Sequence, residues 1–133
     1  MDALKKRVLL FCVSFAIPII FFRIAIYFLC SRNGCEFVQS VTGLTVHHFH
    51  FGFILLLIGL LLLIFYPKED RVLIPLGLGV GTIADQFIPS LFLETERAHE
   101  LALYSQSYVA TFILMGIVVA LAFGIYYFRK KFT

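Results

Sequence analysis

The chain has 133 residues, of which 61% are hydrophobic, 17% aromatic and 14% charged, and its mean hydropathy is +0.97. A soluble domain is about half apolar and about a quarter charged, so this composition excludes a water-soluble enzyme and a disordered chain. The three cysteines are too few for a disulfide scaffold and lack the CxxC spacing of a zinc ribbon. The composition predicts an all-α, polytopic integral membrane protein.

Four apolar stretches each approach the roughly 20 residues that a helix needs to cross a bilayer. We expect one domain over 1–133 with four transmembrane helices, at Val8–Cys30, His47–Tyr66, Val72–Leu93 and Ser107–Phe128. The first stretch is long and has no small-x-small cleavage site, which favours a retained anchor over a signal peptide. The short connection 67–71 predicts an antiparallel hairpin between the second and third helices.

The orientation follows from the basic residues near the span ends, which concentrate on the cytoplasmic side of membrane proteins. One side carries Lys5, Lys6, Arg7, Lys68, Arg71, Arg129, Lys130 and Lys131, and the other carries Arg32 and Arg97. This bias predicts a multi-pass protein with both termini cytoplasmic. The loops Ser31–Val46 and Glu94–Gln106 are then expected on the non-cytoplasmic side.

Small residues at intervals of four indicate helix faces that allow close backbone approach in lipid. The fourth span carries Gly116, Ala120 and Gly124, and the third carries Gly77 and Gly81 with Asp85 next in the row. These faces predict packing within the chain or in a homo- or hetero-oligomer, and the glycine face should bury Asp85. The expected partners are the lipid bilayer and such helices, with no nucleic acid.

Two ionisable residues, Arg23 and Asp85, lie well inside the predicted spans. A charge at that depth is costly and normally has a partner. Both residues lie about 10–12 Å below the outer surface by the helical rise of 1.5 Å per residue. Their common depth predicts an ion pair or a shared polar cavity. The alternatives are a purely structural bridge and an Arg23 side chain that snorkels outward.

Three of the four histidines, His47, His48 and His50, lie at the outer entrance of the second span. Imidazole is a common ligand of zinc, iron and copper. In a helix His47 and His50 share a face, whereas in an extended segment His48 and His50 do so. Either conformation offers two ligands, which predicts a metal site. The opposing interpretation is that these histidines simply meet headgroups and water.

Further ligands are available on the same side, because Glu96 and His99 are three residues apart and share a face if that loop is helical. We therefore expect a composite divalent-metal site, most simply for zinc, with ligands drawn from His47, His48, His50, Asp85 and His99. Asp85, Glu96 and Arg23 are the candidate catalytic residues. The two carboxylates would ligate the ion or accept a proton, and the guanidinium would hold a substrate phosphate or carboxylate.

The leading functional hypothesis is a metal-dependent hydrolase that acts on a lipid or membrane peptide. Ion or proton translocation and a non-catalytic role in a larger membrane complex are the alternatives. Cys30 and Cys35 also leave open a disulfide in the first outer loop. Their spacing does not favour thiol redox catalysis. Haem ligation lacks a second histidine at a suitable depth within the spans.

Overall fold

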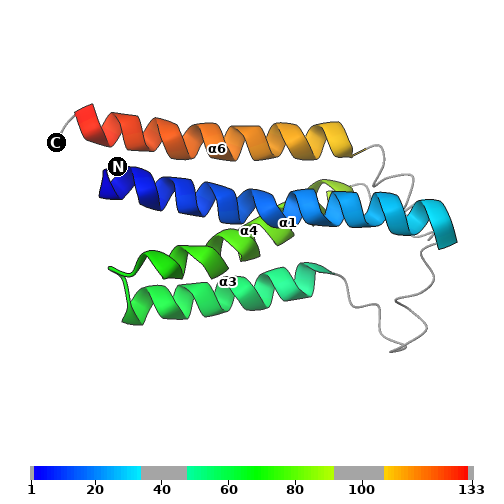
Figure 1. The fold of residues 1–133 in the computed structure, drawn as a ribbon, viewed down its shortest axis with the longest axis horizontal. Helices are drawn as coiled ribbons and strands as arrows, with labels where there is room; N and C mark the ends of the chain where they lie inside the picture. Colours follow the sequence, from blue (N-terminus) through cyan, green and yellow to red (C-terminus); the bar gives the residue numbers. More distant parts are fainter. Residues whose placement is uncertain (1, 34–47, 92–106, 132–133) are drawn as a thin grey trace.

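The computed structural model describes residues 2–33, 48–91 and 107–131, and the regular secondary structure of these residues is helical, with no strands among them (Figure 1). The long helices are α1 (Ala3–Asn33), α3 (His48–Phe65), α4 (Leu73–Leu91) and α6 (Tyr108–Lys131), and a 3₁₀ turn, η1 (Asp70–Val72), precedes α4. A helix is present at each of the four predicted stretches, with boundaries shifted by a few residues. Two of them, over Ala3–Ala25 and Tyr108–Lys131, are long and apolar enough to cross a membrane.

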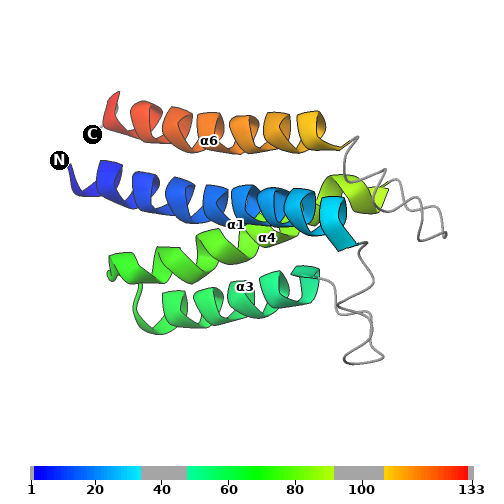
Figure 2. The same ribbon diagram turned by 45° about the vertical axis from the view of Figure 1, so that its right-hand side comes forward.

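Helix α4 is the centre of the arrangement and lies between α3 and the pair formed by α1 and α6 (Figures 1 and 2). Its most extensive contacts are with α1 and α3, while α6 packs more sparsely on α1 and α4. The turn after α3 returns the chain at once into α4, so the predicted antiparallel hairpin is confirmed. Among the described elements, α3 contacts mainly α4 and, to a smaller extent, η1.

Glycines on two faces of α4 bring the neighbouring backbones close. A Cβ at Gly77 would lie 2.6 Å from the Cβ of Ser14, and one at Gly81 would collide with the backbone carbonyl of Phe15, both on α1. On the opposite face, a Cβ at Gly79 would lie 2.5 Å from the amide nitrogen of Leu56 on α3. The predicted glycine face of α4 therefore packs on α1, and the alternate glycine serves a second interface.

The small-residue stripe of α6 makes no such contact in the described part of the chain. A Cβ at Gly116 or Gly124 would meet nothing within 4 Å, and Ala120 between them is exposed. Only 6% of the residues in the apolar stretch of α6 are buried. The α6 stripe is thus not used for packing among the described helices, unlike the glycines of α4.

The start of α1, the turn before α4 and the end of α6 gather at one end of the bundle (Figure 1). The Lys6 ammonium lies 2.9 Å from the Asp70 carboxylate, and Arg7 Nη2 donates to the Pro67 carbonyl at 3.1 Å. The hydrogen bond from Lys6 lowers the pKa of Asp70, and the charges of Lys6 and Arg7 act in the same direction. The basic start of α1 is therefore joined to the α3–α4 turn by direct contacts.

Candidate functional site

The two charged residues inside the helices form a buried ion pair between α1 and α4. Arg23 Nε donates to Asp85 Oδ1 at 2.5 Å, and Arg23 Nη2 donates to the Asp85 backbone carbonyl at 2.8 Å. Their side chains are 2% and 0% exposed. The predicted pairing is confirmed, and the alternative in which Arg23 snorkels outward is wrong. Asp85 lies on the Gly77–Gly81 face, as that spacing predicts.

Helix α6 and Ser107, the residue that precedes it, supply a second set of partners to the same guanidinium. Arg23 Nη1 donates to Ser107 Oγ and Nη2 to Thr111 Oγ1, each at 2.9 Å. The Tyr108 ring centroid lies 5.0 Å from Arg23 Cζ, and its hydroxyl donates to the Arg23 carbonyl at 3.0 Å. Arg23 therefore joins three helices through one polar cluster, which we call the Arg23 cluster.

Sequence reasoning missed the contribution of α6 to the Arg23 cluster. The available signal was the spacing of Ser107 and Thr111, which are four residues apart at the start of an otherwise apolar helix and so share a face. Both side chains are buried, at 5% and 0% exposure. Buried hydroxyls need hydrogen-bond partners, but the sequence shows only that the two share a face and not that they are buried.

The bonds of Arg23 indicate what the side chain does. The two donations to Asp85 and the two to hydroxyls of α6 use most of the five N–H groups of a guanidinium. A side chain held in this way positions α1, α4 and α6 against one another. The predicted role of Arg23 in holding a substrate anion stays a prediction, and these bonds do not favour it.

The histidine-bearing end of α3 docks on α4 at the level of Asp85, through the next residue, Gln86. The Phe49 backbone amide donates to Gln86 Oε1 at 3.1 Å, and Gln86 follows Asp85 in the chain. This bond satisfies one of the amides that the first turn of a helix leaves without an internal acceptor. The first turn of α3 and the turn of α4 that carries Asp85 are therefore at the same level of the bundle.

Of the three clustered histidines, His48 and His50 belong to the described part of α3. His50 is exposed, and its ring lies edge-on to Phe49 at 6.1 Å. His48 is the first residue of α3. His47 lies outside the described residues.

The remaining predicted ligands and Cys35 lie outside the described residues. Glu96 and His99 lie within 92–106, and Cys35 lies within 34–47. Within 2–33, 48–91 and 107–131, no group of three or more His, Cys, Asp or Glu side chains is placed to hold a metal ion. The composite metal site of His47, His48, His50, Asp85 and His99, with catalytic Glu96, stays a prediction.

Comparisons of the chain with family models, with curated proteins and with solved structures give no match. The functional argument therefore depends on the residues and contacts described above.

Proposed function

We propose that the chain is a four-span integral membrane protein whose two ends and α3–α4 turn are cytoplasmic. At 1.5 Å per residue, the 18 residues of α3 and the 19 of α4 extend about 27 and 28 Å, close to the roughly 30 Å of hydrocarbon in a bilayer. Helices α1 and α6 are longer and meet the length and hydropathy of a span.

The distribution of charge supports this orientation. Among the described residues, the basic side chains at the start of α1, in the α3–α4 turn and at the end of α6 share one end of the bundle, and contacts such as Lys6–Asp70 join them. Arg23 and Asp85, at the other end, neutralise each other. A bundle with its basic end toward the cytoplasm obeys the positive-inside rule.

At the opposite, non-cytoplasmic end we propose a divalent-metal site, with zinc as the ion that best suits its ligands. The observation that carries this proposal is the Phe49–Gln86 hydrogen bond, which holds the histidine-bearing turn of α3 beside the turn of α4 that contains Asp85. His48 and His50 would supply nitrogen ligands from that turn. His47, Glu96 and His99, which precede α3 or follow α4 in the sequence, would complete the coordination.

The activity that we propose for this site is hydrolysis of a lipid or membrane peptide. A bound zinc ion lowers the pKa of its water toward neutrality and so supplies hydroxide. Glu96 would then serve as the general base, and Asp85 would ligate the ion or orient a ligand. In this proposal Arg23 is a positioning residue that fixes Asp85 through the bonds of the Arg23 cluster.

Elemental analysis of the full-length protein, purified in an uncharged detergent without chelators, tests the metal site. We expect about one zinc per chain in the wild type, and less than half of that in His48→Ala and in His50→Ala. Phe49→Leu is the matched control, because it lies between the two histidines and removes no ligand. A wild type that stays metal-free after incubation with zinc, or equal zinc in all four proteins, would overturn the proposal.

A second assay separates hydrolysis from metal binding. Glu96→Gln should retain zinc and lose the release of fatty acid from phospholipid vesicles, or of fragments from a membrane-spanning peptide. Zinc binding without either activity in the wild type would support the metal site and refute the proposed hydrolase activity. The bonds of Arg23 and Asp85 to each other give no support to the ion-translocation alternative.

The exposure of α6 favours a second candidate function, that of a subunit in a larger membrane complex. Its stripe of Gly116, Ala120 and Gly124 is open within the described part of the chain, as a face for another helix would be. Co-purification of a partner at fixed stoichiometry from the native membrane, lost on Gly124→Leu, would support this function. A chain that purifies alone and monomeric would refute it.

A further inference from the structure

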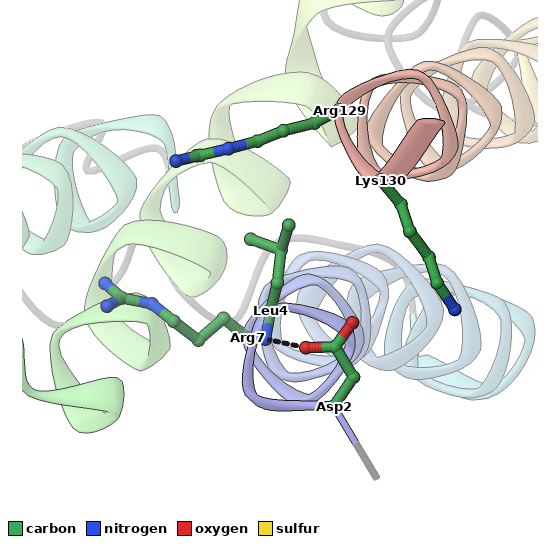
Figure 3. A pocket seen from close by; sticks show the side chains of 5 residues that line it. All are labelled: Asp2, Leu4, Arg7, Arg129 and Lys130. Carbon is green, nitrogen blue, oxygen red and sulfur yellow. Dashed lines mark hydrogen bonds between the residues drawn. The ribbon is translucent and has the colours of Figure 1, made fainter. Parts of the chain in front are cut away.

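A pocket of about 710 Å³ lies at the basic end of the bundle, between the start of α1 and the end of α6. We call it the α1–α6 pocket, and it is lined by Asp2, Leu4, Arg7, Arg129 and Lys130 (Figure 3). It lies at the opposite end from the Arg23 cluster and the histidines, as the course of α1 and α6 shows (Figure 1). Neither the metal site nor the Arg23 cluster uses it.

The single acid of the α1–α6 pocket is engaged in holding the two helices together. Asp2 Oδ1 accepts a hydrogen bond from the Leu4 amide at 3.1 Å, which caps the start of α1. Asp2 Oδ2 accepts one from the Tyr126 hydroxyl of α6 at 3.3 Å. Asp2 thus builds the wall of the pocket and neutralises only part of its positive charge.

Three cations line the pocket against this one carboxylate. In the view of Figure 3, Arg7 from α1 and Arg129 from α6 extend across the pocket to the same side, and Lys130 lies on the side of Asp2. Arg7 is also held by the Pro67 carbonyl and lies 3.8 Å from Asp70, so its position is fixed by the α3–α4 turn. The lining therefore carries a net charge of +2, which suits an anion.

We propose that the α1–α6 pocket binds a phosphate group carried by the headgroup of an anionic lipid. Arginine binds phosphate through paired N–H groups, and lysine does so as a point charge. Basic pockets between membrane helices on the cytoplasmic side are suited to lipid phosphates. The proposal rests on the membrane topology proposed above and is independent of the metal site.

Two observations favour a lipid over free phosphate as the source of the anion. The pocket volume of about 710 Å³ exceeds what a lone phosphate ion fills and leaves room for a glycerol headgroup. The helices that form the pocket also continue with exposed apolar side chains, among them Leu9 and Val13 on α1 and Leu121 and Ile125 on α6. Acyl chains attached to a phosphate at this end would run beside such side chains.

Calorimetric titration of the full-length protein with short-chain phosphatidylglycerol tests the proposal. The protein is held in an uncharged detergent at 0.15 M salt, where charges more than about 8 Å apart are largely screened. We expect Arg129→Gln and Lys130→Gln each to weaken binding at least about fivefold. Lys131→Gln is the matched control, because it removes the same charge from an adjacent exposed position outside the pocket. It should weaken binding less than about twofold.

Inorganic phosphate forms the second arm of the experiment and should bind more than about tenfold more weakly than the lipid. Equal affinity for phosphate and lipid would overturn the lipid as the source of the anion. No binding, or equal loss in the three variants, would overturn the pocket itself. Zinc content measured on the same preparations separates this result from failure of the metal site, and unchanged melting temperatures show that the variants are folded.

Discussion

The Arg23–Asp85 pair gives the sharpest test of the fold, because both side chains are almost fully buried. Asp85→Ala removes the carboxylate that is paired with the guanidinium and keeps the bonds to the hydroxyls of Ser107 and Thr111. Removing one partner of a buried pair typically costs about 3–5 kcal/mol, since the remaining charge is uncompensated. Arg23→Leu should cost a similar amount, because it removes the guanidinium that donates to the Asp85 carboxylate and to both hydroxyls.

The double variant Arg23→Leu/Asp85→Ala removes both charges together. The double variant still loses about 2–4 kcal/mol of unfolding free energy in all, because it leaves a cavity and removes the guanidinium from two hydroxyls. Independent residues would instead give the sum of the single losses, about 6–10 kcal/mol. We therefore expect a coupling free energy of about 2 kcal/mol or more between Arg23 and Asp85.

The assay is reversible unfolding in mixed micelles, followed by helical circular dichroism, for the wild type, both single variants and the double variant. Arg23→Leu combined with Gly124→Ala is the control cycle, since Gly124 lies on the open stripe of α6. Its two effects should add within about 0.5 kcal/mol. Additive losses for Arg23 and Asp85, with the same precision, would refute the buried pair.

Three further predictions follow from contacts elsewhere in the bundle. Gly81→Ala should cost about 2 kcal/mol or more in the same unfolding assay, because the added Cβ collides with the Phe15 carbonyl. Gly124→Ala should change stability by less than about 1 kcal/mol. Equal effects of the two substitutions would contradict the close packing of α4 on α1. Gln86→Ala should cost about 1 kcal/mol and speed hydrogen exchange of the Phe49 amide, whose acceptor it removes; unchanged exchange would contradict this contact. The Asp70 pKa lies below its ordinary value of 3.8, so the stabilisation by the ionised carboxylate is present above pH 3.8 and is lost as the pH falls through the lowered pKa. Over that pH range the melting temperature of the wild type should fall more than that of Asp70→Asn. Parallel curves of melting temperature against pH would contradict this prediction.

The ion pair could be predicted from the sequence because two strong physical constraints act on it. A charge inside a span needs a partner, and the fixed rise of a helix converts sequence position into depth. Counting from the outer span ends therefore placed Arg23 and Asp85 at one level without any knowledge of the packing. The interval of four from Gly77 and Gly81 likewise placed Asp85 on the buried face.

The α6 side of the Arg23 cluster could not be derived in the same way. Hydroxyl side chains carry no charge and give no comparable demand for a partner. Which face of α6 meets α1 depends on a sparse interface with no glycine contact at Gly116 or Gly124. The spacing of Ser107 and Thr111 showed that they share a face of the helix, but not what that face meets.

Small-residue spacing showed a similar limit, since the same interval predicts different outcomes on α4 and α6. The pattern states that a backbone can approach closely, but it does not identify the neighbour. On α4 the interval from Gly77 to Gly81 marks the contact with α1. The intervening Gly79 packs on α3, which counting along a single face does not reveal. On α6 the pattern is as regular and meets no described helix.

Helix α4 connects the parts of the molecule on which the functional proposal depends. Its Gly77–Gly81 face carries Asp85 to Arg23 on α1, and its opposite face, through Gly79 and Gln86, holds α3. Because α3 contacts the other described helices mainly through α4, the histidines at its start are positioned relative to Asp85 by this one interface. A change that widens the α3–α4 interface without touching a histidine should therefore weaken a metal site there, whereas histidines that merely meet lipid headgroups would not respond to it.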